Sequence, residues 1–342
     1  MSNYSDTYRS LLDKAISANR LKLAPNTSGI LVTGATGLIG ASIIDMLVRI
    51  NDTRTSKFFI YVAARNFDKV KRVFKNYINK DYFKYVYYDA TEPIDFNNVK
   101  VDYIIQGASN ASPNLYTSNP VETLLGNVLG IKNILDYAKT KNIRKVVYIS
   151  SSEVYGNSES RQNVIAEDDY GNVDVLKVRS SYMLGKQASE NLCVSYAKEY
   201  GIDVSIVRPG HIYGPHISEY DKRASSEFLR NASNHEKIVM NSSGRQLRSY
   251  CHAVDCASAI LYVLEAGENG EAYNISNKKS IVTIREFAEC VSKIGKVSLE
   301  IGKDDNAVIS YSALDSEKLE QKGWQAVVDI NAGIEEVIED LS

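Results

Sequence analysis

A short segment in which three glycines follow an apolar run constrains the fold of this chain more than any other feature. The segment reads GILVTGATGLIG and spans residues 29–40. Its apolar first half is typical of a buried parallel strand, and the spacing of apolar residues in 38–50 predicts a helix. A strand, a glycine-rich turn and a helix in this order are typical of the first unit of a doubly wound α/β sheet.

The glycine spacing predicts a dinucleotide-binding turn between this strand and this helix. Gly34 permits the tight turn, Gly37 lets the backbone approach a pyrophosphate, and Gly40 allows the helix to pack closely on the strand. The first N–H groups of the helix, around Leu38 and Ile39, would meet the negative charge of the ligand. The alternative is a tight turn that binds no ligand.

Further strand and helix signals alternate along the chain and predict the rest of the sheet. Apolar strand candidates lie at 57–65, 83–90, 101–109, 145–152 and 203–210. Helical segments separate most of them, notably at about 120–141 and 182–200. The alternation predicts a Rossmann-type α/β fold, a doubly wound parallel sheet with helices on both faces and ligands beyond the carboxyl ends of its strands.

By the same pattern the chain divides into three parts. Residues 1–28 are polar, with a helical stretch near 5–21, and we expect them to pack on the outside as an N-terminal extension. Residues 29–205 form the predicted dinucleotide-binding domain. Residues 206–342 alternate irregularly between strand-like and helical pieces, so we expect mainly a smaller α/β substrate lobe, with some chain returning to the first domain.

Charge and composition argue against several classes of protein. A net charge of −2 leaves no excess of positive charge to neutralise phosphates, which argues against binding to nucleic acid or to anionic membranes. No apolar run approaches the roughly 18–20 residues needed to span a bilayer, and the N-terminus lacks the apolar core of a secretory signal. The cysteines form no CxxC pair and the histidines no ligand cluster, so we expect a cytoplasmic protein without a metal site.

The end of the second predicted strand bears on the choice of dinucleotide. A carboxylate there would bond the ribose 2′-hydroxyl of NAD and repel a 2′-phosphate, but this chain has Arg65 and Asn66. Arginine suits phosphate, so the charge argument favours NADP, whereas an Arg65 that stacks on the adenine edge would fit either cofactor. Asp89 and Ala90, which close the third strand, are candidates for contact with the adenine.

Tyr182 and Lys186 stand four residues apart within RSSYMLGK, residues 179–186. On a helix this spacing puts both side chains on one face. A free phenol has a pKa of about 10 and is a poor base at neutral pH unless a nearby cation stabilises the phenolate. The pair is therefore a candidate acid/base with the cation that tunes it, although the spacing alone is a weak signal.

Five motifs in matching order give these features a common interpretation. They are TGATGLIG, ISSSEVYG at 149–156, the Tyr182–Lys186 pair, RPGHIYGP at 208–215 and RSYCHAVDCASAI at 248–260. With them the chain resembles, over roughly residues 29–340, the extended short-chain dehydrogenase/reductases of the NAD-dependent epimerase/dehydratase family, which act on nucleotide sugars. The resemblance implies a bound NAD or NADP, a nucleotide-diphosphate sugar as substrate, and oxidation of that sugar at C4.

The resemblance also implies roles for the matched side chains. Tyr182 would take the proton from the sugar hydroxyl, Lys186 would lower the pKa of the phenol and hold the nicotinamide ribose, and Ser151 would bond the substrate oxygen. Arg248 would pair with the substrate diphosphate. The further residues placed along the cofactor are Gly107, Ala108, Ser109, Asn127, Ser150, Pro209 and Gly210.

The residues that follow Ser151 bear on the reaction that comes after C4 oxidation. Sugar 4,6-dehydratases carry an Asp–Glu pair there, whereas this chain has Ser152 and Glu153, so dehydration is disfavoured. A serine followed by a glutamate, together with the segment 108–135, looks more like the UDP-glucuronate decarboxylases. In such an enzyme Ser152 would lie at the substrate, and Glu153 is a candidate for managing protons.

Several alternatives stay open at the level of sequence. His211 stands where many family members have asparagine, and it would serve either as an additional acid/base or as a hydrogen-bond donor to substrate. A 4-epimerase, an NADPH-dependent 4-ketosugar reductase and a non-catalytic dinucleotide-binding scaffold compete with the decarboxylase, although scaffolds usually lose the Tyr182–Lys186 pair. Family members commonly dimerise through two helices, so we expect a homodimer through 120–141 and 182–200.

Overall fold

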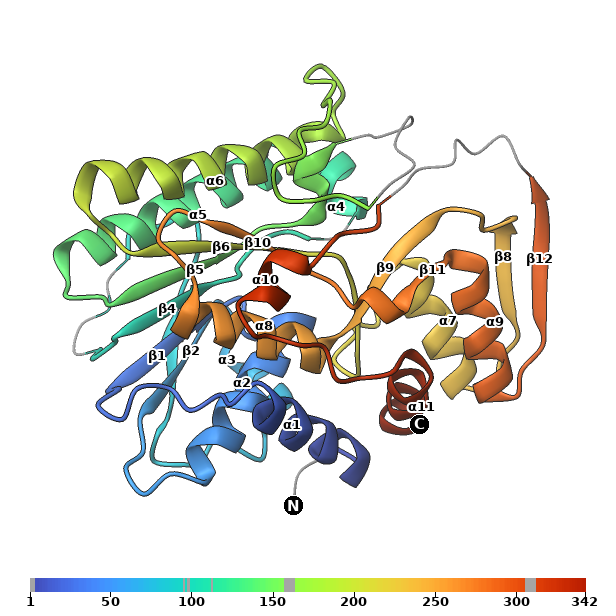
Figure 1. Ribbon diagram of the computed structural model, residues 1–342, viewed down its shortest axis with the longest axis horizontal. Coiled ribbons are helices and arrows are strands. Elements are labelled where there is room, and N and C mark those ends of the chain that lie inside the picture. The colour runs from blue at the N-terminus through green and yellow to red at the C-terminus, as the bar shows by residue number, and fades with distance from the viewer. Residues whose placement is uncertain (1–3, 95, 97–98, 112, 157–163, 305–311) are drawn as a thin grey trace.

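The computed structural model describes residues 4–94, 96, 99–111, 113–156, 164–304 and 312–342. Its centre is a seven-stranded sheet in the order β10-β6-β5-β4-β1-β2-β3, in which every neighbouring pair is parallel (Figure 1). The strands are β1 (Gly29–Thr33), β2 (Phe59–Ala64), β3 (Phe83–Tyr87), β4 (Tyr103–Gln106), β5 (Lys145–Ile149), β6 (Val204–Pro209) and β10 (Ala272–Ile275). The predicted doubly wound Rossmann-type sheet is confirmed, and its strand order reverses between β1 and β4, where ligands of such folds bind.

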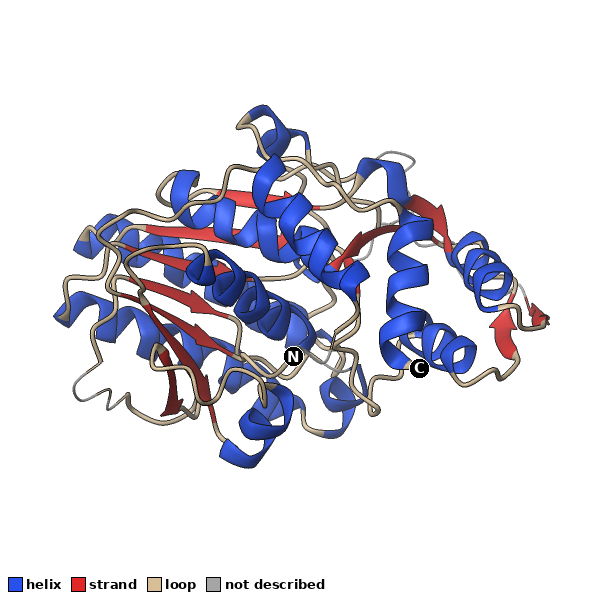
Figure 2. Ribbon diagram, turned by 90° about the horizontal axis from the view of Figure 1, so that it is seen from below, coloured by secondary structure: helices blue, strands red, loops and turns tan. Residues whose placement is uncertain are grey.

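Helices cover both faces of this sheet (Figures 1 and 2). One face carries α2 (Leu38–Asp52) and α8 (Ala253–Ala266), on which α1 (Asp6–Ala18) packs from outside, and the other carries α5 (Pro120–Thr140) and α6 (Ser180–Tyr200). Side chains alternate between the two cores along β1: Ile30 and Val32 pack into the first, and Leu31 packs into the second. Burial on both faces explains why the strand reads as a continuous apolar run.

A smaller lobe lies beside the carboxyl ends of these strands (Figure 1). It contains a three-stranded sheet of β7 (His211–Tyr213), β9 (Leu247–His252) and β11 (Ile281–Thr283), and a pair formed by β8 (Ile238–Ser242) and β12 (Leu299–Asp304). Helices α7 (Ala224–Ser233), α9 (Ile284–Gly295) and α11 (Ile330–Leu341) complete its core around Phe228, Phe287 and Ile334. Between β9 and β11 the chain returns to the large sheet, where it forms α8 and β10.

Short elements connect these layers. They are α3 (Phe67–Val73), α4 (Pro113–Ser118), η1 (Ser152–Tyr155), η2 (Lys278–Ser280) and α10 (Glu317–Gln321). The N-terminal helix α1 begins at the cap Ser5, whose hydroxyl accepts a hydrogen bond from the Tyr8 N–H, and it buries Tyr8, Leu12 and Ala15. Across the described parts of the chain, the longest apolar helices fall short of what crossing a bilayer requires.

Candidate active site

The turn between β1 and α2 contains the three predicted glycines, and the structure separates their reasons for being glycine. Gly34 has φ +64°, and a Cβ there would lie 2.6 Å from the carbonyl oxygen of Gly107. A Cβ on Gly40 would collide with the Gly34 carbonyl oxygen. A Cβ on Gly37, in contrast, would make only an ordinary 3.4 Å contact with that oxygen. The packing of the chain requires Gly34 and Gly40, whereas the space above Gly37 is left open for a group outside the protein.

That open space lies at the positive end of α2. Gly37 is the N-cap of the helix, no side chain in the described residues caps it, and the first turn contains no acidic residue. The first N–H groups of the helix, including those of Leu38 and Ile39, therefore have no intrahelical acceptor. Partial positive charge and free donors at an uncrowded turn fit a diphosphate. The residues present thus fit the pyrophosphate of a dinucleotide.

The ends of β2 and β3 bring Arg65 and Asp89 together. Arg65 Nη1 lies 3.8 Å from an Asp89 carboxylate oxygen, and the arginine side chain is 70% exposed. Asp89 also accepts hydrogen bonds from the N–H and the hydroxyl of Thr91, and these hold the pKa of its carboxyl below the usual value. Asn66 caps α3 by accepting from the Lys69 N–H at 2.9 Å, and the Ala90 carbonyl accepts from the Asn133 amide. Asn66 and Ala90 both lie at the edge of the sheet that is predicted to contact the cofactor, but their observed hydrogen bonds are made within the protein.

The end of β4 supplies small residues beside the glycine turn. The N–H groups of Gly107 and Ala108 donate to the Thr33 hydroxyl at 3.0 and 3.1 Å, which fixes this end of β4 against β1. The Ser109 hydroxyl donates to the Asn127 side-chain oxygen at 2.9 Å, and the Asn127 amide donates to the helix carbonyl of Thr123. Asn127 is therefore locked in one orientation on α5, facing the end of β4.

Tyr182 and Lys186 occupy one face of α6, as the spacing predicts. Both side chains are buried, and Lys186 Nζ lies 5.8 Å from the centre of the Tyr182 ring. Lys186 Nζ donates to the carbonyl oxygen of Ile149, the last residue of β5, at 2.7 Å. The lysine is thus held between α6 and the end of a central strand.

The surroundings shift the pKa values of this pair in opposite directions. Burial, and then the negative charge of Glu153, raise the pKa of Tyr182 to about 12, while hydrogen bonds with Ser151 and Tyr116 lower it. Burial lowers the pKa of Lys186 to about 7, against the opposing effect of the Glu190 carboxylate. In the protein alone the phenol is therefore neutral at pH 7, and the lysine is present in both its charged and its neutral form.

The segment after β5 places Ser151 and Glu153 next to Tyr182. The Ser151 hydroxyl caps η1 by accepting from the Glu153 N–H at 3.2 Å, and it lies close enough to the Tyr182 phenol to lower the pKa of that group. Both oxygens of the Glu153 carboxylate pair with Arg179, each at 3.3 Å. The neighbouring Ser150 hydroxyl is buried and has no hydrogen-bond partner among the described residues. Ser152 begins η1 and is half-buried.

Sequence reasoning missed two residues at this site. The ring of Tyr116, from α4, stacks on the Tyr182 ring with centroids 4.3 Å apart and planes 9° apart. Arg179 precedes α6, pairs with Glu153 and lies over the Tyr116 ring at 5.9 Å. Arg179 stands in the same segment as Tyr182, and Tyr116 follows the Ala-Ser-Pro stretch within 108–135, but their partners depend on the tertiary fold.

The small lobe contributes His211 and Arg248 from neighbouring strands. In the β7–β9 register His211 pairs with Tyr250, which places Arg248 two residues along the same strand. Burial, followed by the charges of Arg248 and Arg223, lowers the pKa of His211 to about 3, so its ring is neutral at pH 7. His211 Nδ1 is buried and has no partner in the described part of the chain. It remains available as a hydrogen-bonding group for a ligand.

The strand end before His211 is tightly packed. Pro209 lies in β6 opposite Ile275 of β10, and the Gly210 N–H donates to the Ile275 carbonyl. A Cβ on Gly210 would lie 2.7 Å from the Ser249 hydroxyl, so the glycine allows β7 to lie against β9. Because β6 neighbours β5 and β7 belongs to the small lobe, this turn leads from the large sheet into the smaller one.

Fold and site together define a class: a dinucleotide-binding α/β enzyme in which a buried Tyr–Lys pair lies beside the end of the central strands. Comparison with known proteins assigns the family within this class. The chain belongs to the NAD dependent epimerase/dehydratase family, whose model matches residues 30–276.

Individual relatives agree with this assignment. The chain is 33% identical over 315 residues to UDP-glucuronic acid decarboxylase 6 of Arabidopsis thaliana. This match covers 91% of this chain and 88% of that enzyme. It is 28% identical to UDP-glucuronic acid decarboxylase 1 of Xenopus tropicalis, over 90% of this chain and 71% of that enzyme. The structure of UDP-glucose 4-epimerase from Thermotoga maritima superposes with a TM-score of 0.76 at 20% identity, covering 91% of this chain and 97% of the epimerase, which shows the shared fold.

Proposed function

We propose that this enzyme oxidises UDP-glucuronate at C4 of its sugar with bound NAD. The resulting 4-keto sugar then loses its C6 carboxylate as carbon dioxide. The observation that carries the chemistry is the buried Tyr182 phenol, which lies beside Ser151 and shares a helix face with Lys186. Similarity to UDP-glucuronic acid decarboxylases over nine-tenths of the chain supports the choice of reaction. Ser152 supports it as well, because dehydration would require an acid at that position.

Each of these residues has a defined task in the proposed reaction. Tyr182 accepts the proton of the C4 hydroxyl, and Ser151 bonds the same oxygen and orients it. Lys186 supplies positive charge one helix turn away, which stabilises the phenolate. When bound, the nicotinamide supplies the hydride acceptor and later the hydride donor, so the overall reaction is redox-neutral.

Decarboxylation follows from the position of the ketone. A C4 carbonyl makes the C6 carboxylate a β-keto acid, so the C5–C6 bond breaks, carbon dioxide leaves and the electron pair moves towards the C4 oxygen. A proton must then be added at C5. Arg179 pairs with the Glu153 carboxylate beside Tyr182, and this position suits Glu153 to accept and return a proton through the bound sugar or a water molecule.

The small lobe is proposed to bind the nucleotide part of the substrate. Arg248 is half-buried on β9 and offers a planar cation suited to a diphosphate. Neutral His211 would hydrogen-bond the substrate, because a ring whose pKa is about 3 cannot act as a general acid at neutral pH. This favours hydrogen bonding among the two roles that the sequence leaves open for His211.

We infer NAD as the resident cofactor, although the charge of Arg65 alone favours NADP. The matched family is described as NAD dependent, and in this chain the Arg65 charge faces the Asp89 carboxylate. The Asp89 carboxylate thus offsets part of the positive charge that would attract a 2′-phosphate. Calorimetric titration of the purified protein with each dinucleotide would test the inference: we expect NAD⁺ to bind at least tenfold more tightly, and tighter binding of NADP⁺ would refute it.

A homodimer through α5 and α6 is the proposed assembly. The two helices pack side by side and expose apolar side chains, among them Val121 and Leu125 of α5 and Val194 of α6. Light scattering should give a mass of twice 38.0 kDa, and Leu125→Glu should halve it. The four cysteines are free thiols, which supports the expected cytoplasmic location.

Incubation with UDP-glucuronate labelled at C6 tests the proposed reaction. The expected result is release of labelled carbon dioxide and formation of a UDP-pentose, with no net change in nicotinamide absorbance. Tyr182→Phe, purified in parallel, should release none. A C4 epimer with the carboxylate retained would identify an epimerase, stoichiometric consumption of NADPH with a 4-keto sugar would identify a reductase, and either result would overturn the decarboxylase proposal.

A further inference from the structure

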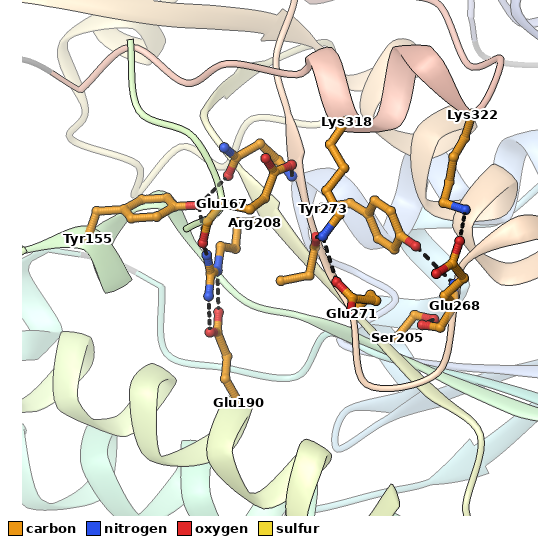
Figure 3. A network of polar contacts seen from close by, with 12 residues as sticks. Tyr155, Glu167, Glu190, Ser205, Arg208, Glu268, Glu271, Tyr273, Lys318 and Lys322 are labelled. Carbon is orange, nitrogen blue, oxygen red and sulfur yellow. Dashed lines mark hydrogen bonds and ion pairs between the residues drawn. The ribbon is translucent and has the colours of Figure 1, made fainter. Parts of the chain in front are cut away.

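Arg208, on β6, lies at the centre of a largely buried polar network that reaches α6 one helix turn from Lys186. Its side chain is 13% exposed and its main partner, Glu190 of α6, is 12% exposed. Figure 3 shows the arginine between α6 below it and Tyr155 and Glu167 beside it. The roles proposed above do not involve this network.

The guanidinium of Arg208 uses all three of its nitrogens. Nε and Nη2 donate to the two carboxylate oxygens of Glu190 at 3.0 and 2.7 Å, a bidentate pair (Figure 3). Nη1 donates to the Tyr155 hydroxyl at 2.8 Å and to the Glu167 carbonyl at 2.9 Å. The Tyr155 hydroxyl in turn donates to the side chain of Asn274, which lies opposite Arg208 on β10.

These partners come from the elements that carry the candidate catalytic groups. Glu190 stands one helix turn after Lys186 on α6. Tyr155 ends η1, the short helix that contains Glu153 and follows Ser151. Arg208 itself is followed by Pro209, Gly210 and His211. A single side chain therefore joins the helix of the Tyr–Lys pair, the segment of Ser151 and Glu153, and the strand that leads into the small lobe.

The same arginine pairs with a carboxylate whose charge acts on Lys186. The Glu190 carboxylate acts to raise the pKa of Lys186, against the effect of burial, and Arg208 pairs with that carboxylate. Through the bidentate pair, Arg208 reduces the field that Glu190 exerts on the lysine. The titratable or charged groups that act on Lys186 are Glu190 and Cys193 of α6, with the rings of Tyr182 and of Tyr148 of β5 beside its ammonium group. Those that act on Tyr182 are Glu153 of η1, Tyr116 of α4 and Arg223, which precedes α7.

We propose that Arg208 is a positioning residue for the Tyr182–Lys186 pair. It fixes α6 against η1 and β6, and it neutralises the carboxylate one turn from Lys186. Its effect on turnover rests on the proposed function, whereas its effect on the charge of Lys186 does not.

The charge effect is testable without substrate. In protein labelled with ¹³C at lysine Cε, the Lys186 resonance is assigned by its absence in Lys186→Arg, and its titration is followed by NMR. Arg208→Gln should raise the Lys186 midpoint by about half a pH unit or more, because Glu190 then acts unopposed. Glu190→Gln should lower it, and the double variant Arg208→Gln/Glu190→Gln should return it towards the wild-type value. An unchanged midpoint in Arg208→Gln overturns the proposal, and if that variant fails to fold, an unchanged midpoint in Glu190→Gln does so.

The positioning effect needs a variant that keeps the charge but loses the geometry. Arg208→Lys should leave the Lys186 midpoint within about 0.2 unit of wild type, yet lower kcat for UDP-glucuronate at least tenfold with KM changed less than threefold. A control with the same substitution is Arg49→Lys, since Arg49 makes a bidentate but more exposed pair with Asp13 between α2 and α1, away from the site. The control should change neither quantity. Wild-type turnover in Arg208→Lys would overturn the positioning role, whereas absence of turnover in the wild type would refute the proposed function and leave the NMR result valid.

Discussion

Tyr182 is the residue on which the proposed chemistry depends, and its surroundings keep it neutral at pH 7. Burial and Glu153 raise its pKa to about 12. The positive charges of Lys186 and of the bound nicotinamide must therefore lower that pKa before the phenol can act as a base. We expect Tyr182→Phe to lower kcat by about 10²–10⁴-fold, the usual contribution of a general acid/base. NAD⁺ affinity, measured by calorimetry, should stay within threefold, because the ring and its stacking on Tyr116 are retained. Equal turnover would contradict the assigned role.

His211 offers a second test at the residue scale, because its two possible roles differ in charge. With a pKa of about 3 the ring is neutral throughout the working range, so it would bond the substrate without exchanging a proton. His211→Asn keeps a neutral hydrogen-bonding group, and we expect kcat within tenfold of wild type. The pH dependence of kcat/KM should be unchanged between pH 6 and 9. Loss of one limb of that profile would show that His211 exchanges a proton with the substrate.

At the scale of elements, the junction of β1 and α2 separates glycines needed for folding from a glycine needed for binding. Gly37→Ala adds a methyl group with only a 3.4 Å contact, so its unfolding free energy should change by less than about 1 kcal/mol. The same methyl occupies the space left open for the pyrophosphate, and NAD⁺ affinity should fall at least tenfold. Gly40→Ala is the matched control, because its methyl would strike the Gly34 carbonyl and destabilise the fold by a few kcal/mol. Urea denaturation and calorimetric titration of both variants check the contrast. Unaltered NAD⁺ binding in Gly37→Ala would place the cofactor elsewhere.

The elements also show what the sequence can predict. The glycine turn, the parallel sheet and the shared face of Tyr182 and Lys186 follow from spacings within single segments, and the structure shows each of them. The contacts of Tyr116 with Tyr182 and of Arg208 with Glu190 join different elements. The spacing of residues within one segment cannot predict such contacts, because they depend on which strands and helices become neighbours in the folded protein. For the same reason the pairing of β8 with β12, about sixty residues apart, was not predictable from the irregular pattern of the last third.

At the scale of the whole molecule, a buried group of polar side chains links α8, α11 and the start of α1, which are distant in the sequence. His252, at the N-terminus of α8, accepts from the Val254 N–H through Nδ1, so its Nε2 carries the hydrogen and donates to Glu336 of α11 at 2.8 Å. Asp340, one turn further along α11, accepts from the Ser5 N–H at the start of α1. Burial, and then Asp340, raise the pKa of Glu336 to about 10. The folded protein therefore holds a proton on Glu336 at neutral pH.

This proton makes stability depend on pH in a direction that can be predicted. Between a pKa near 4.5 in the unfolded chain and about 10 in the folded one, only the folded state keeps the proton. Unfolding releases it, so Glu336 lowers the free energy of unfolding as pH rises, by at most about 1.4 kcal/mol per pH unit. Glu336→Gln keeps a neutral group of the same shape and removes this dependence. Urea denaturation at pH 6, 7.5 and 9 should show the variant gaining stability relative to wild type as pH rises, whereas Glu335→Gln, at an exposed neighbouring position, should show a constant difference. A constant difference for Glu336→Gln as well would mean that its carboxyl is ionised in the folded protein.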